Sequence, residues 1–330
     1  MDTLLRVDNL HTHFNTPRGV VKAVNGVNLQ LKKGEILGIV GESGSGKSVM
    51  AQSLLRVVPK ANRARIDGRA EFGGIDLMQL GEEEMRKVRG ARIAMVTQNP
   101  STSLNPVMTV GDQMLETMRF HPDRIPSDAR TRDRMLTLMN EVQLPTPAAI
   151  AKRYPFQLSG GMKQRIAIAM ALMCDPELLI ADEPTTALDV TIQAQILELI
   201  RSARRVHGTS VIFITHDLGV IAQLCDTVAV MYAGKIIEYN TVQEIFRTPR
   251  HPYTQGLLES NPVFGKTKKT LHAMQGQPPD LATLGDGCAF APRCPRALVA
   301  CRERPPQRVA LGDHFHHACA VVQDHGAVPA

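Results

Sequence analysis

Residues 41–48 read GESGSGKS, a stretch with three glycines within six positions and a lysine and a serine at its end. The apolar run EILGIV precedes it, and the segment VMAQSLLRVV follows it. In this strand–loop–helix setting, the pattern G-x-x-x-x-G-K followed by Ser or Thr is typical of a P-loop, whose backbone N–H groups surround phosphate. The stretch therefore predicts a binding site for a nucleoside triphosphate.

Each part of this loop has a predicted role. Gly41, Gly44 and Gly46 can take backbone angles that are closed to other residues, so successive N–H groups can turn inward around a phosphate. Lys47 adds a positive charge for the terminal phosphates, and the Ser48 hydroxyl can bind Mg²⁺. The start of the following helix adds a favourable dipole. The predicted nucleotide contacts are Gly41, Glu42, Ser43, Gly44, Ser45, Gly46, Lys47 and Ser48.

The composition favours a globular protein on the cytoplasmic side of a membrane. The chain has 330 residues, of which 43% are hydrophobic, enough to bury a substantial core. No stretch approaches the about 18 uninterrupted apolar residues of a membrane span, and Asp2, Arg6 and Asp8 argue against a signal peptide. The net charge is +6, but only 4% of residues are aromatic and Trp is absent, so we expect no nucleic-acid partner.

The periodicity of apolar residues predicts a mixed α/β order of elements. Short strands are expected in the first 100 residues, at 4–10, 26–31, 35–40 and 92–96. From about Thr109 to Gln157 the pattern becomes helical. Beyond that insert, helix and strand alternate, which implies a parallel sheet. The alternating elements are a helix at 159–172, a strand at 177–182, a helix at 190–208 capped by Gly208, a strand at 210–216 and a hairpin that turns at Ala233 and Gly234.

An acidic pair ends the apolar strand in ELLIADEP, at Asp182 and Glu183. A carboxylate at the tip of a strand beside a P-loop can hold Mg²⁺ through water, and a second one can polarise an attacking water. We assign these roles to Asp182 and Glu183, respectively. An acidic pair alone is also a common helix cap, so its pairing with the P-loop is what makes it specific.

A second helix start with phosphate-binding character lies at 158–165, which reads LSGGMKQR. Ser159 is a natural N-cap, and Gly160 and Gly161 let backbone N–H groups approach an anion. A plain capped helix would use the same residue types. The chain thus has two helix starts suited to phosphate but only one lysine-bearing loop.

LSGGMKQR resembles the signature of the ATP-binding-cassette (ABC) family, and further motifs follow in family order. Gln98 in MVTQNP is similar to the glutamine loop, which contacts Mg²⁺ and the membrane partner. ALD, from Ala187 to Asp189, resembles the D-loop, which contacts the second domain of a dimer. His216 in ITHD resembles the switch histidine at the terminal phosphate. Phe14 stands where family members place an aromatic ring against adenine.

The resemblance implies a fold class and a mechanism. The fold is a P-loop NTPase cassette over 1–260, with a mixed-sheet core, an antiparallel β subdomain and a helical subdomain at about 101–175. In this family two domains pair head to tail, each P-loop closing with ATP on the partner's signature, and hydrolysis reopens the pair. The implied contacts are Ser159, Gly160, Gly161 and Gln164 for the partner's ATP, Asp189 for the dimer, and Ser48, Gln98 and Asp182 for Mg²⁺.

The C-terminal part indicates a branch of the family. FRTPRHPYT at 246–254 and GCAFAPRCPRA at 287–297 resemble the ATPases of dipeptide and oligopeptide importers. The implied partners are a second, paralogous ABC ATPase subunit, two transmembrane permease subunits and an extracytoplasmic substrate-binding protein. The chain itself would be peripheral on the cytoplasmic face of the inner membrane. Importers of nickel, glutathione or antimicrobial peptides are related and remain alternatives.

Two other classes of function are also open. Soluble cassette proteins act in DNA repair or on ribosomes, but they commonly carry two cassettes or large inserted arms. A binding module with an inactive site is disfavoured, because Lys47, Asp182, Glu183 and His216 are all present.

The cysteines form two groups. Cys174 and Cys225 lie singly in apolar contexts and are expected in the core. The other four, spaced C-x5-C-x6-C-x17-C, fall in a segment rich in proline and glycine that we interpret as a C-terminal appendix over 261–330. A cytoplasmic chain seldom keeps disulfides, so a metal site or inert thiols are the options. The resemblance implies a 4Fe–4S cluster held by Cys288, Cys294, Cys301 and Cys319, with zinc bound together with His314, His316 or His317 as the alternative.

Overall fold

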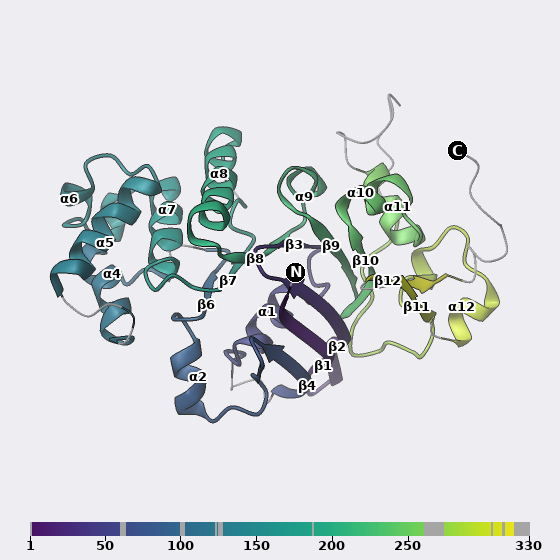
Figure 1. The fold of residues 1–330 in the computed structure, drawn as a ribbon. Helices are drawn as coiled ribbons and strands as arrows, with labels where there is room; N and C mark the ends of the chain where they lie inside the picture. Colours follow the sequence, from purple (N-terminus) through teal and green to yellow (C-terminus); the bar gives the residue numbers. More distant parts are fainter. Residues whose placement is uncertain are drawn as a thin grey trace. The chain divides into compact units, whose positions relative to one another are not determined.

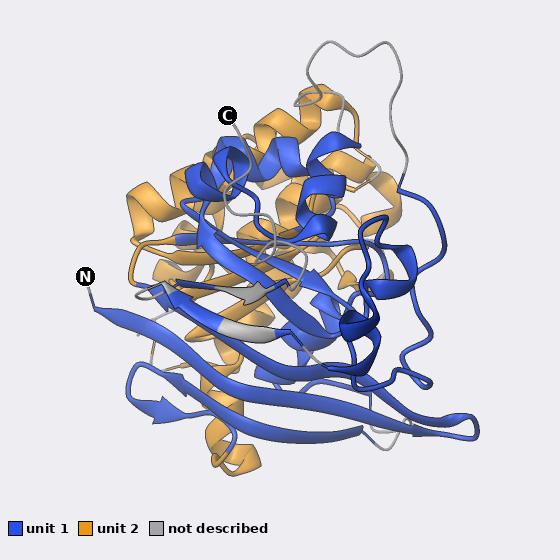
Figure 2. Cartoon of the chain, turned by 90° about the vertical axis from the view of Figure 1, so that its right-hand side faces the viewer, with its two compact units in different colours: residues 1–32, 36–78, 215–330 blue, residues 33–35, 79–214 orange. Residues whose placement is uncertain are grey.

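The computed structural model describes residues 2–59, 64–99, 103–122, 124, 128–186, 188–260, 274–304, 306–311 and 314–319. The chain divides into two compact units (Figure 2). Unit 1 comprises residues 1–32, 36–78 and 215–330, and unit 2 comprises residues 33–35 and 79–214. The boundary predicted near residue 261 and the D-loop residue Ala187 lie outside the described residues.

Unit 1 contains an antiparallel sheet with the strand order β2-β1-β4-β5 (Figure 1). Leu5 of β1 aligns with Leu31 of β2 and Phe72 of β4, and all three side chains are fully buried. The first two strands run well past the predicted ranges, since the polar residues at their ends still pair across the hairpin. The strands are β1 (Thr3–Thr16), β2 (Gly19–Lys32), β4 (Ala64–Phe72) and β5 (Ile75–Asp76).

Unit 1 also contains a mixed group of strands in the order β11-β12-β10-β9-β3. The pair β3–β9 is parallel, and the other pairs are antiparallel. The predicted hairpin turn is confirmed, with positive φ at both Ala233 and Gly234, as the right-handed twist of a hairpin favours. The strands are β3 (Ile36–Val40), β9 (Thr227–Tyr232), β10 (Lys235–Thr241), β11 (Gln307–Leu311) and β12 (His314–Ala318).

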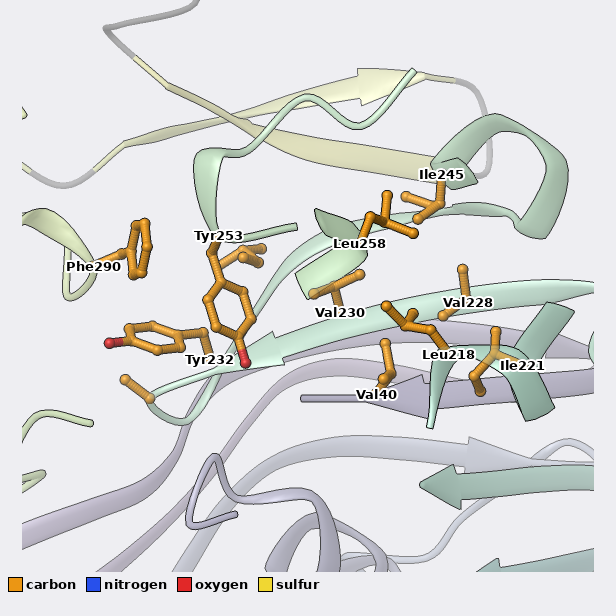
Figure 3. Packing of buried hydrophobic residues seen from close by; sticks show 12 residues of the cluster. Val40, Leu218, Ile221, Val228, Val230, Tyr232, Ile245, Tyr253, Leu258 and Phe290 are labelled. Atoms are coloured by element: carbon orange, nitrogen blue, oxygen red, sulfur yellow. The ribbon is translucent and has the colours of Figure 1, made fainter. Parts of the chain in front are cut away.

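The three helices between residues 218 and 259 share one apolar core with β3, β9 and Phe290 of the C-terminal segment (Figure 3). Tyr232, Tyr253 and Phe290 lie together at one end of this core, with ring centroids 4.4–5.5 Å apart. The described part of the predicted appendix is therefore packed into unit 1. The helices are α1 (Lys47–Leu54), α9 (Leu218–Leu224), α10 (Val242–Arg247), α11 (Pro252–Glu259), the 3₁₀ turn η3 (Ala291–Arg293) and α12 (Val299–Glu303).

Unit 2 combines parallel strands in the order β6-β7-β8 with a block of helices. The parallel pairing predicted from the alternation of helix and strand is confirmed. Within the helical block, α4 and α5 both contact α7. The elements are β6 (Ile93–Val96), β7 (Leu178–Asp182), β8 (Ser210–Thr215), α2 (Glu82–Val88), α4 (Val110–Arg119), α5 (Asp128–Glu141), α6 (Pro147–Ile150), η2 (Pro155–Gln157), α7 (Gly160–Ala171) and α8 (Val190–His207).

Candidate nucleotide-binding site

The P-loop connects β3, whose five residues are all buried, to α1. Gly44 and Gly46 have φ angles of 79° and 103°, which fits the prediction that glycine is needed there for its backbone freedom. Gly41 does not have a positive φ, so the reason predicted for it is wrong. A Cβ at Gly41 would lie 2.1 Å from the carbonyl oxygen of Met231, so close approach between backbones requires glycine there.

The charge of Lys47 is held inside the loop. Its ammonium group donates hydrogen bonds to the carbonyl oxygens of Gly41 at 2.7 Å and Glu42 at 2.9 Å, and only 5% of the residue is exposed. The first turn of α1 contains no acidic residue that would offset the helix dipole, and Ser48 lies half-buried in that turn. The loop thus concentrates positive potential where a polyphosphate can bind.

Glu42, the second residue of the P-loop, contacts the C-terminal part of the chain. Its backbone N–H donates to the Tyr253 hydroxyl at 2.9 Å. Its carboxylate accepts two hydrogen bonds from the Arg293 guanidinium, at 2.6 and 3.0 Å. The sequence interpretation missed these partners, because Arg293 lies 251 positions away and no spacing rule links the two residues. Their opposite charges were the only available signal.

His216 directly follows β8 and is exposed, and hydrogen bonds fix the backbone beside it. The Asp217 N–H donates to the Thr215 hydroxyl at 3.0 Å, and the Asp217 carboxylate accepts from the Gly219 N–H at 2.7 Å. Phe14 lies half-buried in β1, in the same unit as the P-loop. The roles of His216 at the terminal phosphate and of Phe14 at adenine stay predictions.

In unit 2, β7 delivers the acidic pair. Asp182 ends the strand and is buried, whereas Glu183 adopts φ 48°, in the left-handed region. The Glu183 carboxylate accepts hydrogen bonds from the Gln98 amide at 3.2 Å and from the Thr186 hydroxyl at 2.9 Å. The structure therefore brings together Gln98 and Glu183, although 85 positions separate them.

The signature residues lie at the start of α7. Ser159 is the N-cap, as predicted, and its hydroxyl accepts from the Met162 N–H at 3.3 Å. Ser159 and Gly160 are exposed, and a Cβ at Gly160 would meet nothing within 4 Å. Gln164 differs, since only 2% of it is exposed. Ser159 and Gly160 are thus open to a ligand from outside the chain, while a direct contact of Gln164 with ATP stays a prediction.

Asp189 caps α8, where its carboxylate accepts from the Ile192 N–H at 2.9 Å. The next residue, Val190, is 84% exposed. At the other end of α8, Gly208 adopts the predicted left-handed cap. Asp189 and Val190 at the start of α8 are therefore both exposed.

The four C-terminal cysteines lie near one another, although they do not form a ready metal site. Burial raises the pKa of Cys288, and the neighbouring thiols Cys319 and Cys301 raise it further. Burial and Cys301 likewise raise the pKa of Cys294. Within the described ranges, no three His, Cys, Asp or Glu side chains are grouped so that they could hold a metal ion.

The histidines proposed as zinc ligands fall into two sets. The His314 ring packs against Tyr239, and the side chains of His316 and His317 lie outside the described part. A different histidine lies near one of the cysteine thiols: the Cys288 sulfur is 3.9 Å from the Nε2 atom of His251. Of the two cysteines expected in the core, Cys174 is buried and Cys225 is half-buried. Burial raises the pKa of Cys174 to about 11 and that of Cys225 further.

Comparisons with known proteins agree with this arrangement. The family model described as ABC transporter matches residues 24–186, and the model described as oligopeptide/dipeptide transporter, C-terminal region, matches residues 237–301. The chain is 50% identical over 315 residues to the dipeptide transport ATP-binding protein DppD of Bacillus subtilis, a match that covers 95% of this chain and 93% of that protein. The chain belongs to the ABC transporter ATP-binding proteins.

Other members of the ABC family support the same assignment. The oligopeptide transport ATP-binding protein OppD of Escherichia coli is 47% identical over 305 residues, which cover 92% of this chain and 89% of that protein. A dimeric ATP-binding cassette in a post-hydrolysis state, bound to ADP and Pi, matches with a TM-score of 0.65 and 28% identity over 72% of this chain and 99% of that chain. The family and the fold class predicted from the motifs are confirmed, and ATP hydrolysis is the reaction of this ABC family.

Proposed function

We propose that this ABC ATPase is the energy-coupling subunit of a membrane importer for dipeptides or oligopeptides. The observation that carries the proposal is the match of residues 237–301 to the oligopeptide/dipeptide transporter C-terminal region, in a chain that aligns with peptide transport ATPases over nearly its whole length. Nickel, glutathione and antimicrobial peptides remain alternative cargoes. Residues 1–260 would be the nucleotide-binding domain and 261–330 the importer-specific part.

ATP would bind at the P-loop and close two ATPase subunits on each other. Lys47 neutralises the terminal phosphates, while Ser48, Gln98 and Asp182 are the proposed holders of Mg²⁺. The exposed Ser159 and Gly160 would contact ATP held by the partner subunit. Asp189 is the proposed dimer contact, and both Asp189 and the neighbouring Val190 are exposed, as a contact with a partner subunit requires.

Hydrolysis would reopen the pair. Glu183 is the proposed general base: it polarises a water whose oxygen attacks the γ-phosphorus, the bond to the bridging oxygen breaks, and ADP and inorganic phosphate leave. The hydrogen bonds from Gln98 and Thr186 support this role, because they fix the carboxylate that must accept the proton. His216 would contact the γ-phosphate in the closed state.

The transport partners follow from the family. Two permease subunits, a paralogous ATPase and an extracytoplasmic binding protein would complete the importer, with this chain on the cytoplasmic membrane face. In the part of the chain that the structure describes, no helix is both long and apolar enough to cross a membrane.

Cys288, Cys294, Cys301 and Cys319 are the proposed ligands of a 4Fe–4S cluster. Their residue type supports this, since cysteine thiolates are the usual ligands of such clusters and also bind zinc. A bound cluster would supply a structural or redox-sensitive crosslink. Iron and acid-labile sulfide in anaerobically purified protein would confirm it, stoichiometric zinc would favour the alternative, and the absence of both would leave four free thiols.

The proposed function is tested by reconstitution. The chain should co-purify with the permease subunits and support ATP-dependent uptake of labelled dipeptides into vesicles that contain the binding protein. Uptake of nickel or glutathione without uptake of peptides would replace the cargo assignment. Fractionation with ribosomes or DNA, and never with a permease, would refute transport.

A further inference from the structure

The C-terminal segment reaches the P-loop through a small set of buried contacts. We call Tyr253, Phe290 and Arg293 the C-terminal brace. Tyr253 comes from α11, whereas Phe290 and Arg293 lie between Cys288 and Cys294. All three belong to unit 1, as the P-loop does.

Arg293 is fully engaged in this brace. Besides the two bonds to the Glu42 carboxylate, its Nε atom donates to the Gln275 carbonyl at 3.0 Å and its Nη1 atom donates to the Tyr232 hydroxyl at 3.4 Å. Only 5% of the Arg293 side chain is exposed. A planar guanidinium can satisfy this set of acceptors at once, whereas a lysine cannot.

Aromatic side chains pack against the Arg293 guanidinium and connect it to the P-loop. The guanidinium lies 5.9 Å from the ring centroids of both Tyr232 and Phe290. Phe290 in turn packs edge-on against Tyr253, whose hydroxyl accepts the Glu42 N–H (Figure 3). Both the side chain and the backbone of Glu42 are therefore fixed by residues of the C-terminal region.

The charge of Glu42 makes these contacts important for binding. A carboxylate within a phosphate-binding loop repels the ligand unless a neighbouring cation neutralises it. The Glu42 side chain is 25% exposed, so its charge can act on an anion in the loop. Arg293 supplies the compensating charge from a buried position, where Coulomb interactions are screened less than at the surface.

We propose that the C-terminal brace is a positioning device for the nucleotide site. Arg293 neutralises and orients Glu42, Tyr253 holds the Glu42 N–H, and the affinity of the P-loop for ATP depends on the conformation of the segment 287–294. Changes at the cysteines on either side of Phe290 and Arg293 would then alter nucleotide binding without touching the P-loop. The inference rests on the proposed role of the P-loop as the ATP site.

The test measures the affinity of the full chain for a fluorescent ATP analogue. Arg293→Met should weaken binding about tenfold, the usual scale for losing one partner of a buried charged hydrogen bond. Glu42→Gln in the same chain should restore the affinity to within about twofold of wild type, because the uncompensated carboxylate is then gone. Arg293→Lys should fall between wild type and Arg293→Met, and the exposed Arg304→Met is the matched control, expected to bind as wild type.

Two outcomes would overturn the proposal. One is unchanged affinity in Arg293→Met, and the other is a loss of affinity that Glu42→Gln fails to restore, since a purely structural role for Arg293 would not respond to the charge of Glu42. Lys47→Ala separates this proposal from the proposed function. If Arg293→Met and Lys47→Ala both bind the ATP analogue as wild type does, the assignment of the P-loop as the ATP site is wrong. If Lys47→Ala weakens binding and Arg293→Met does not, only the proposed role of the C-terminal brace is refuted.

Discussion

The chain contains two glycine-rich helix starts suited to phosphate, and they are built in opposite ways. Two of the three P-loop glycines are enclosed: a Cβ at Gly41 or Gly46 would lie 2.1 or 2.2 Å from a backbone oxygen, whereas a Cβ at Gly44 would meet nothing within 4 Å. The signature start is open at its first residues, because a Cβ at Gly160 would meet nothing within 4 Å and Ser159 is exposed. A Cβ at Gly161 would meet only a side-chain atom, a methyl group of Ile192 at 3.1 Å. We therefore expect the P-loop to bind a nucleotide by itself and the signature start to contact a nucleotide that is held elsewhere.

The first prediction tests whether both helix starts act on the same ATP. Glu183→Gln should lower turnover about 1000-fold and leave ATP binding intact, because it removes the proposed general base while the P-loop and the signature helix start remain unchanged. With ATP, the closed dimer should accumulate. Phosphate release and size-exclusion chromatography with ATP would measure the two effects. Turnover close to wild type would refute the role of Glu183.

The second prediction uses one substitution at both helix starts. Gly41→Ala should destabilise the protein by about 3 kcal/mol, because the new methyl group overlaps a backbone oxygen that cannot move cheaply. Gly160→Ala should leave stability within about 0.5 kcal/mol of wild type, since the space is open. Urea unfolding of the two variants is the comparison. Equal stability would mean that the enclosure of the P-loop is not as described.

The third prediction separates the sites by ligand binding. Lys47→Ala should weaken the affinity of the single chain for ATP about 30-fold, through loss of a charged hydrogen-bond donor. Ser159→Asp keeps an N-cap oxygen but adds a negative charge, so single-chain affinity should stay unchanged while ATP-driven pairing is lost. Titration calorimetry and light scattering measure these quantities. Weakened single-chain binding in Ser159→Asp would contradict the open-start interpretation.

The smallest expected effect concerns pH and the helical block that carries the signature. His207, at the end of α8, contacts Asp175 at 3.2 Å and Glu141 at 2.9 Å, and the hydrogen bond to Asp175 raises its pKa. A raised folded-state pKa means that its stabilisation is fully present below about pH 6.5 and is lost as pH rises through the folded-state value.

Between pH 6 and pH 8.5, the thermal midpoint of wild type should therefore fall by about 2 °C relative to His207→Gln. Differential scanning fluorimetry at the two pH values provides the measurement. If the thermal midpoint of wild type changes between the two pH values by as much as that of His207→Gln, the contacts of His207 contribute no net stabilisation.

The sequence alone predicted what depends on local pattern. The positive φ of Gly44 and Gly46, the N-cap Ser159, the C-cap Gly208 and the turn at Gly234 each follow from a few adjacent residues, and all have the expected conformation. The need for glycine at position 41 was predicted for the wrong reason, because the clash comes from Met231, far along the chain.

Contacts between segments far apart in the chain could not be predicted from local sequence patterns. The pairing of Glu42 with Arg293 and that of Gln98 with Glu183 arise from tertiary packing, and one sequence without relatives carries no signal for them. For the same reason the burial of Gln164 was not predicted from LSGGMKQR, where its polar residue type suggests exposure. The sequence identified the residues of the motifs, whereas the residues that contact and position them became known only from the folded structure.

The left-handed backbone of Glu183 limits which amino acids can ever occupy that position. At φ 48° a β-branched residue such as Val, Ile or Thr is strained, whereas Gly, Asn and Asp are the best tolerated. Few amino acid types can therefore replace Glu183 without strain. A substitution at this position changes the strain of the backbone as well as the chemistry of the side chain.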